Sequence, residues 1–254
     1  MSQASTSPRS SSPRSSSLGR SERGADLSAR YAGLEGAALL RPLIEREFPG
    51  RIAAVSSFGA EAAVLLHLIA EIEPATPVIF LDTGKHFPET LAYREEVTAR
   101  LGLSDVRVVS PDPLSAAHLD PTGTLWRDGP DHCCHLRKVV PLRRALSGFE
   151  AWITGRKRYQ GGARRGLAAI EQAGGHVKIN PLAGWSEARV EAAFRDAALP
   201  RHPLVGEGYT SIGCAPCTRR AVCGAAARSG RWLGTGKTEC GIHWPSQSTS
   251  QNTL

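Results

Sequence analysis

The chain has 254 residues, of which 41% are hydrophobic and 22% charged, and its formal net charge is +7. This apolar content excludes a wholly disordered chain and is enough for one folded unit with a sizeable core. Of the charge, +3 lies in residues 1–30, and the other basic residues are scattered rather than arranged in a stripe, so we expect no nucleic-acid binding. No apolar run reaches about eighteen residues and no secretory signal is visible, so we expect a cytoplasmic protein that does not bind membranes.

Residues 1–28 are rich in Ser, Arg and Pro, and the last ten residues are also polar. Such segments bury too little apolar surface to offset the entropy lost on ordering. We therefore predict that residues 1–28 form a disordered tail.

Between these polar ends, strand and helix patterns alternate. Strands are predicted over 51–58, 77–84, 105–110 and 150–155. Helices are predicted over 60–72, from Pro88 to Leu101, over 133–146 and over 186–197. Repeated βα units predict an α/β fold, a mostly parallel sheet with helices on both faces.

Three of the predicted strands end in segments rich in small and polar residues, SSFGAE, LDTGKHFP and TGRKRYQGGARR. Ligands of such sheets bind beyond the carboxyl ends of the strands, where glycine allows close approach of the backbone to a phosphate. Any one of these segments could be an ordinary turn. The three together favour a nucleotide site, although neither the dinucleotide-binding nor the Walker motif is present.

Five cysteines form a pattern: the adjacent pair Cys133 and Cys134, the Cys-x-x-Cys pair Cys214 and Cys217, and Cys240. Four thiolates suit either zinc or an iron-sulfur cluster. Adjacent side chains diverge, which favours a cluster, whose irons lie apart, over a single zinc ion. A disulfide and simple core packing are weaker alternatives in a reducing compartment.

Cys240 stands alone in the sequence GKTECGIHW. A reactive thiol needs nearby positive charge to stabilise its thiolate, and Lys237, His243 and arginines brought close by the fold could supply it. By itself this pattern is weak support for a catalytic nucleophile.

Seven motifs between about residues 50 and 244 resemble the assimilatory sulfonucleotide reductases, specifically the bacterial adenylyl-sulfate reductases that carry a [4Fe-4S] cluster. They are SSFGAE (56–61), LDTG (81–84), CCHLRKVVPL (133–142), TGRKRYQGGARR (154–165), IGCAPCTR (212–219), RSGRW (228–232) and KTECGIH (237–243). Their order and spacing make coincidence improbable, and the last motif is the most specific.

The resemblance implies a Rossmann-like fold of the adenine nucleotide alpha hydrolase type and a set of site residues. The [4Fe-4S] cluster would be bound by Cys133, Cys134, Cys214 and Cys217. Adenosine would lie near Ser56, Ser57, Gly59, Asp82 and Gly84. The catalytic group would be Cys240 with His243, Lys138, Arg165, Arg228 and Arg231. This sequence departs from the family pattern in two places. Gln160-Gly161 replaces the family's Gln-Ser, which leaves Arg164 as the alternative to Arg165. The first motif lacks the more frequent Ser-Phe-Ser-Gly order, which weakens Ser57 as a contact.

The implied reaction begins with attack of the Cys240 thiolate on the sulfur of adenosine 5'-phosphosulfate, which gives AMP and an S-sulfocysteine. Thioredoxin or glutaredoxin would then release sulfite, a step of assimilatory sulfate reduction that leads to cysteine. Only fourteen residues follow Cys240, so we expect the reductant to be a separate protein. We accordingly expect a reductase domain over 29–236 and a mobile C-terminal segment over 237–254 that carries the nucleophile.

Three other functions remain open. The nearest is a phosphoadenylyl-sulfate reductase, which differs only in the 3'-phosphate of its substrate. An ATP pyrophosphatase-type tRNA thiolation enzyme would share the sheet, but its S-G-G-x-D-S loop is absent. A non-enzymatic zinc or iron-sulfur module would leave KTECGIH unexplained. The sequence leaves open whether the chain forms a homo-oligomer.

Overall fold

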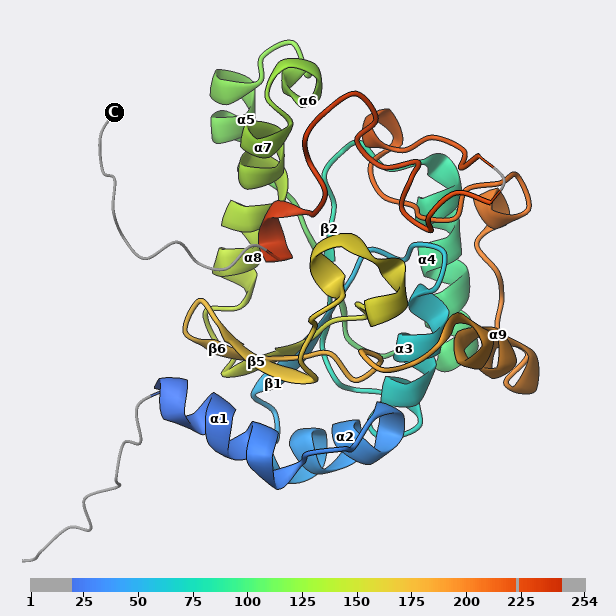
Figure 1. Ribbon diagram of the computed structural model, residues 1–254. Helices are drawn as coiled ribbons and strands as arrows, with labels where there is room; N and C mark the ends of the chain where they lie inside the picture. The colour runs from blue at the N-terminus through green and yellow to red at the C-terminus, as the bar shows by residue number, and fades with distance from the viewer. Residues whose placement is uncertain (1–19, 223, 244–254) are drawn as a thin grey trace, which may run out of the picture.

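A six-stranded sheet lies at the centre of the computed structural model, which describes residues 20–222 and 224–243 (Figure 1). Its order is β3-β2-β1-β4-β6-β5, and β5 runs antiparallel to β6 whereas the other neighbours are parallel. This confirms the predicted α/β class with a mostly parallel sheet. The strands are β1 (Ile52–Ser56), β2 (Val78–Leu81), β3 (Val106–Val109), β4 (Ala151–Ile153), β5 (Ile170–Ala173) and β6 (His176–Ile179).

Helices cover both faces of the sheet because successive strand residues point to opposite sides. Ala54 and Phe80 belong to the larger core, whereas their neighbours Ala53 and Ile79 belong to a second, smaller core. The larger core includes residues of α2 (Gly36–Pro42), η1 (Leu43–Glu47), α3 (Ala62–Ala70), α4 (Pro88–Leu101) and α9 (Glu187–Asp196). The smaller core includes residues of α8 (Val140–Ala145).

The ends of two helices follow from local sequence. Pro88 occupies the first turn of α4, and Gly102, with φ of +63°, ends the helix in the left-handed conformation that glycine adopts readily. The Ser186 hydroxyl caps α9 by accepting a hydrogen bond from the Arg189 N–H at 3.2 Å. Both helices match their predicted ranges closely.

Short helices form much of the remaining chain between the long elements. Those before β4 are α5 (Pro113–Leu119), α6 (Leu125–Asp128), α7 (Pro130–Cys134) and η2 (His135–Val139). Those after β4 are η3 (Arg158–Gln160), η4 (Gly162–Arg164), η5 (Pro203–Val205), η6 (Ala215–Cys217) and η7 (Gly241–His243). No helix of the described chain is long and apolar enough to cross a membrane.

The predicted disordered tail is wrong for its last part, because helix α1 (Arg20–Arg30) begins before residue 28. Leu27 is 1% exposed and belongs to the larger core. Arg23 donates to Glu150 at 2.5 Å and lies 4.5 Å above the Phe48 ring. These contacts with distant parts of the chain stabilise a helix whose own composition is polar; residues 1–19 and the last eleven lie outside the described residues.

We predict that Leu27→Ala lowers the free energy of unfolding by about 2–5 kcal/mol, because it leaves a cavity in the core. Urea denaturation of the full chain measures this, with exposed Ser28→Ala on the same helix as the control. Equal stability of the two variants would show that α1 does not dock on the sheet.

Candidate active site

The main cavity opens at the point where the strand order reverses. β1 pairs with β2 on one side and with β4 on the other, so the loops after β1 and β4 separate at the carboxyl edge of the sheet. Both loops line the cavity, together with residues 210–213, Lys138 and the segment 239–243. The short helix η7 in that last segment packs against α7 and η2, beside α8 in Figure 1. Stretches far apart in sequence therefore meet at one site.

The loop after β1 supplies the wall in which the adenosine was expected. Ser56, Ser57 and Gly59 all line the cavity, as the resemblance implied. Phe58 between them has φ of +46°, an uncommon conformation for a residue other than glycine. A side chain at Gly59 would place its Cβ 2.9 Å from the Ile212 carbonyl oxygen, so only glycine allows this loop to lie against the segment before Cys214.

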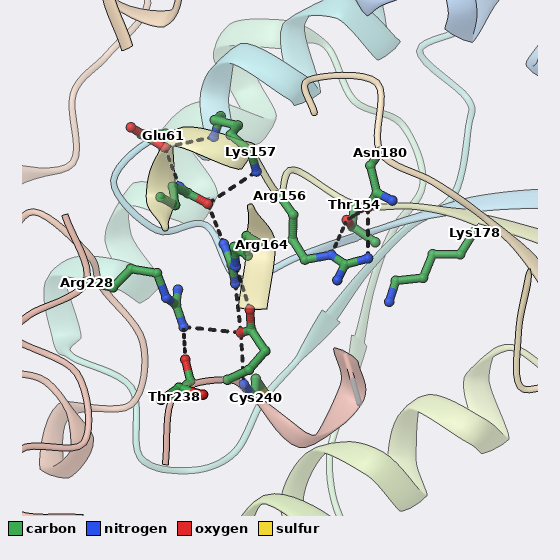
Figure 2. A network of polar contacts seen from close by, with 12 residues as sticks. Glu61, Thr154, Arg156, Lys157, Arg164, Lys178, Asn180, Arg228, Thr238 and Cys240 are labelled. Carbon is green, nitrogen blue, oxygen red and sulfur yellow. Dashed lines mark hydrogen bonds and ion pairs between the residues drawn. The ribbon is translucent and has the colours of Figure 1, made fainter. Parts of the chain in front are cut away.

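Glu61 joins the two loops that flank the cavity. Its carboxylate accepts hydrogen bonds at 2.8 Å from both the Lys157 ammonium and the Gln160 amide, and a further one from the Tyr159 hydroxyl. Burial lowers the pKa of Lys157, opposed by the charge of Glu61. The pair holds the loop after β4 against the loop after β1 (Figure 2).

The structure places the LDTG motif differently from the expectation. Asp82 and Gly84 do not line the main cavity; the Asp82 carboxylate accepts the Gly84 N–H at 2.9 Å and closes a local turn. Between them, the Thr83 hydroxyl lies 3.3 Å from the Cys214 sulfur, and the Thr83 carbonyl accepts a bond from Arg137. Within the motif, Thr83 therefore faces the cysteines, whereas Leu81 lines the main cavity.

Four basic side chains line the cavity close to Cys240: Lys138, Arg164, Arg228 and Arg231. Three of these were expected. The fourth differs, because Arg164 points inward and is 8% exposed whereas Arg165 is exposed and does not line the cavity. The tight turn of η4 directs only one of the two adjacent side chains inward.

Lys138 lies between the cysteines and Cys240. Burial alone would lower its pKa, but the nearby sulfurs of Cys214, Cys240 and Cys134 raise it above the usual range, so the ammonium stays charged. Burial lowers the pKa of Arg231, and the same sulfurs oppose that effect. Lys138 and Arg231 line both the main cavity and the cysteine cavity described below.

Cys240 lies against Cys134, and its side chain lines the main cavity. A hydrogen bond from the Cys134 thiol holds the pKa of Cys240 well below its usual value, against burial, which raises it; Lys138, the Ile242 N–H and Arg231 add to the lowering. Lys237 does not line the cavity but pairs with Asp131 at the start of α7, which attaches this segment to the helix that carries Cys133 and Cys134.

His243 lines the cavity with its ring parallel to Trp152, the centroids 6.0 Å apart. Its pKa is lowered well below the ordinary value by burial and by the charges of Lys178, Arg156, Arg164 and Arg228. The imidazole is therefore neutral near pH 7 and does not supply positive charge to Cys240, contrary to the expectation from the sequence.

The four remaining cysteines of the pattern line one small second cavity, which lies between α7 and η6. Cys133, Cys134 and Cys214 are buried, and burial raises the pKa of Cys133 to about 11, with the Cys214 thiol adding to the effect. Within residues 20–222 and 224–243, no three His, Cys, Asp or Glu side chains converge as the ligands of a single ion would. The donor set that this cavity offers is four thiols.

The comparisons with known proteins agree with this geometry. The chain matches the phosphoadenosine phosphosulfate reductase domain over residues 51–220. It belongs to this family. An adenosine 5'-phosphosulfate reductase of Mesorhizobium japonicum is 49% identical over 225 residues, which cover 89% of each chain. A phosphoadenosine 5'-phosphosulfate reductase of Gloeobacter violaceus is 40% identical and covers 85% of this chain and 92% of that protein.

Solved structures support the same fold. The phosphoadenylyl-sulfate reductase of Candida auris, in its phosphate complex, matches with a TM-score of 0.66 and 29% identity over 78% of this chain and 97% of that chain. Yeast FAD synthetase shares the fold alone, with a TM-score of 0.50 and 17% identity over 79% of this chain and 75% of that one. The predicted family and fold are confirmed.

Sequence reasoning missed several residues that the structure brings to the site: Glu61, Arg156, Lys157, Gln160, Lys178 and Glu239. Arg156 and Lys178 both pair with Glu171 beside His243, and Arg156 donates to Asn180 at 3.2 Å. Glu239 had one available signal, since it directly precedes Cys240 in the most specific motif. Glu61, Arg156, Lys157 and Gln160 also lie inside quoted motifs, whereas Lys178 lies outside all of them and only the fold brings it to the site.

We predict a pH-dependent contribution of Lys178 to stability. Burial lowers its pKa to about 8, with Arg156 adding to the effect and Glu171 opposing it. The unfolded chain therefore holds this proton more tightly than the folded one, so the free energy of unfolding gains a component that rises between about pH 8 and pH 10.4. Denaturation of the natural protein and of Lys178→Met across this range should show the difference between them growing in favour of the natural protein. A constant difference would contradict the lowered pKa.

Proposed function

We propose that this chain is an adenylyl-sulfate reductase that uses Cys240 as its nucleophile. The observation that carries the proposal is the position of Cys240, at one cavity with Lys138, Arg231 and the loops of the nucleotide-type switch point. A thiol beside buried cations suits attack on an anionic, electrophilic sulfur.

The substrate would lie across the cavity with its adenosine near Ser56, Ser57 and Gly59 and its phosphosulfate toward Cys240. Backbone groups at the end of β1 and basic side chains opposite them suit a nucleotide with an anionic end. The relatives named adenosine 5'-phosphosulfate reductases and the two cysteine pairs favour the substrate without a 3'-phosphate. Phosphoadenylyl sulfate is the second candidate, since the relative from Gloeobacter violaceus carries that name.

In the first half-reaction, the Cys240 thiolate attacks the sulfur of the phosphosulfate. A sulfur-sulfur bond forms, the bond between that sulfur and the bridging oxygen breaks, and AMP leaves with the electron pair. Lys138, Arg228 and Arg231 stabilise the negative charge that grows on the bridging oxygen, each well-placed donor with an effect of order 10² on the rate. The neutral His243 can donate or accept a hydrogen bond beside the nucleophile but does not add to the charge.

In the second half-reaction, a thiolate of thioredoxin or glutaredoxin attacks the Cys240 sulfur and releases sulfite. The second thiol of the reductant then resolves the mixed disulfide, so the dithiol supplies the two electrons and Cys240 is returned as a thiolate. Because Cys240 lies at the cavity, the segment that carries it must move out to meet a protein partner. Within the described residues, this motion would involve the segment 237–243; the rest of the predicted mobile segment, 244–254, lies outside the described residues. We propose that the enzyme works in the cytoplasm.

We further propose that Cys133, Cys134, Cys214 and Cys217 hold a [4Fe-4S] cluster. Four buried or half-buried thiols line one cavity, and the side chains of the adjacent Cys133 and Cys134 diverge, which fits several irons better than one zinc ion. When bound, the cluster would join α7 to η6 and hold an anionic group beside Lys138. The Thr83 hydroxyl and Arg137 border the same cavity and could donate to its sulfurs.

The nucleophile is tested by incubating the purified enzyme with adenylyl sulfate in the absence of any reductant. We expect one sulfonate group on the intact protein and, after digestion, on the peptide that contains Cys240, with one AMP released for each adduct. Cys240→Ser should form no adduct and release no AMP. Turnover by a protein whose Cys240 is never modified would contradict the proposal, and a preference for the 3'-phosphorylated substrate would favour the second candidate.

The cluster is tested by iron and sulfide analysis of anaerobically purified protein. We expect about four irons per chain, a marked loss of iron in Cys217→Ser, and unchanged iron in Cys240→Ser, because Cys240 is not among the four proposed ligands. A colourless natural protein that contains only zinc would overturn the cluster assignment.

A further inference from the structure

Glu239 is an acidic side chain in the strongly basic wall of the cavity. Its side chain is 8% exposed, and it lines the cavity together with Arg164 and Arg228. Burial would raise its pKa, but bonds and charge from Arg164, with a contribution from Arg228, lower it to about 2. The carboxylate is therefore charged near neutral pH.

The carboxylate connects three parts of the chain. Arg164, from the loop after β4, donates two parallel bonds to it, from Nε to Oε2 at 2.5 Å and from Nη2 to Oε1 at 2.8 Å. Arg228 donates to Oε1 at 3.2 Å, and the backbone N–H of Cys240 donates to the same oxygen at 2.9 Å. Figure 2 shows Arg164 and Arg228 converging beside Cys240.

This arrangement leaves Arg164 bound to protein groups through each kind of nitrogen in its guanidinium. Nε and Nη2 bind Glu239, and Nη1 binds the Gln160 side chain. Gln160 in turn donates to Glu61, which holds the two cavity loops together. Arg164 thus links the scaffold of the cavity to the segment of the nucleophile.

We propose that Glu239 is the positioning residue for Cys240: its ion pairs with Arg164 and Arg228 hold the segment 237–243 closed over the cavity and must break before the reductant can reach the thiol. This inference rests on the proposed function and deepens it. A fork-shaped guanidinium pairs with a carboxylate in one plane, so the pair sets an orientation as well as a distance.

The same oxygen that binds the arginines also binds the Cys240 N–H, and this decides against a second explanation. If Glu239 only occupied the binding site of the substrate anion, the bound substrate would displace its carboxylate from that site. The hydrogen bond that orients Cys240 would then be lost. Closure and correct placement of the thiol require Glu239 to stay paired while the substrate reacts. The basic side chains left to meet the phosphosulfate are then Lys138 and Arg231, with the remaining donors of Arg228.

The test compares the natural protein, with its metal site loaded, with Glu239→Gln, which keeps the shape of the side chain but loses its charge. Each half-reaction is measured separately. We expect adduct formation on Cys240 to slow by at least about tenfold with the affinity for AMP within about threefold, and release of sulfite from the preformed adduct by thioredoxin to become faster. A variant that only misfolds would slow both steps and weaken AMP binding.

Opening of the segment is also measured without any substrate, by alkylation of Cys240 followed by peptide mass analysis. A change in the pKa of Cys240 alters its rates with small and bulky reagents equally, whereas opening favours the bulky reagent. We therefore expect Glu239→Gln to raise the ratio of the rate with a polymer-linked maleimide to the rate with iodoacetamide. This readout remains valid even if adenylyl sulfate is not the substrate. It therefore separates a failure of the proposed role of Glu239 from a failure of the proposed function.

Two further variants complete the design. Glu191→Gln removes the same charge from a two-bonded arginine pair on the exposed side of α9 and should leave both half-reactions and the alkylation ratio unchanged. Arg164→Lys keeps the charge but loses the fork, and it should change the same quantities in the same direction as Glu239→Gln. The proposal would be overturned if the rates and the alkylation ratio were unaltered in both Glu239→Gln and Arg164→Lys. It would also be overturned if either variant formed the adduct faster and bound AMP more tightly.

Discussion

Buried positive charge is the constraint on which this structure depends. Lys138, Arg164, Arg228 and Arg231 all line one cavity, and burial opposes the charged form of at least three of them. Such a group of cations is stable only where anions compensate for the lost water. The protein supplies the Glu239 carboxylate on one side and, on the other, the Cys240 sulfur, whose pKa is lowered. The remaining surplus of positive charge is what an anionic nucleotide would meet.

The fold concentrates these groups because the sheet has a single point at which its strand order reverses. The loops after β1 and β4 separate there, and Glu61 holds them together through Lys157 and Gln160. The segments that carry Cys214, Arg231 and Cys240 come from much later in the chain and cover the opening. The carboxyl edge of the sheet forms the base of the cavity, and short helices and loops enclose it. This arrangement suits a reaction in which the nucleotide must reach Cys240 in the first step and a protein reductant must reach it in the second.

Local sequence patterns were sufficient to predict the class of the fold and most strands of its sheet. The strands β1 to β4 and the helix α4 follow from apolar runs, Pro88 and Gly102, all of which act over a few residues. Helix α1 could not be predicted this way, because its polar sequence is stabilised by Leu27 and Arg23 contacts with distant residues. Strands β5 and β6 were both missed for a similar reason, since their pairing is set by the turn between them and by the packing of α1.

The site shows the same division. Motif resemblance placed the cysteines, Lys138, Arg228, Arg231 and the first nucleotide loop, all of which the structure brings to the two adjoining cavities. It could not decide between Arg164 and Arg165, because adjacent side chains in a tight turn point in different directions. Nor could it show that Thr83, between Asp82 and Gly84, faces Cys214, or that Glu239 would be surrounded by arginines.

The most direct test of this account is a crystal structure of the metal-loaded Cys240→Ser variant, prepared without oxygen, with adenylyl sulfate bound. The account predicts that the adenosine lies against Ser56 and Gly59, that the sulfate sulfur faces the side chain at position 240 between Lys138 and Arg231, and that Glu239 remains paired with Arg164. A nucleotide bound outside the cavity, or bound inside it with the sulfate directed away from position 240, would contradict it.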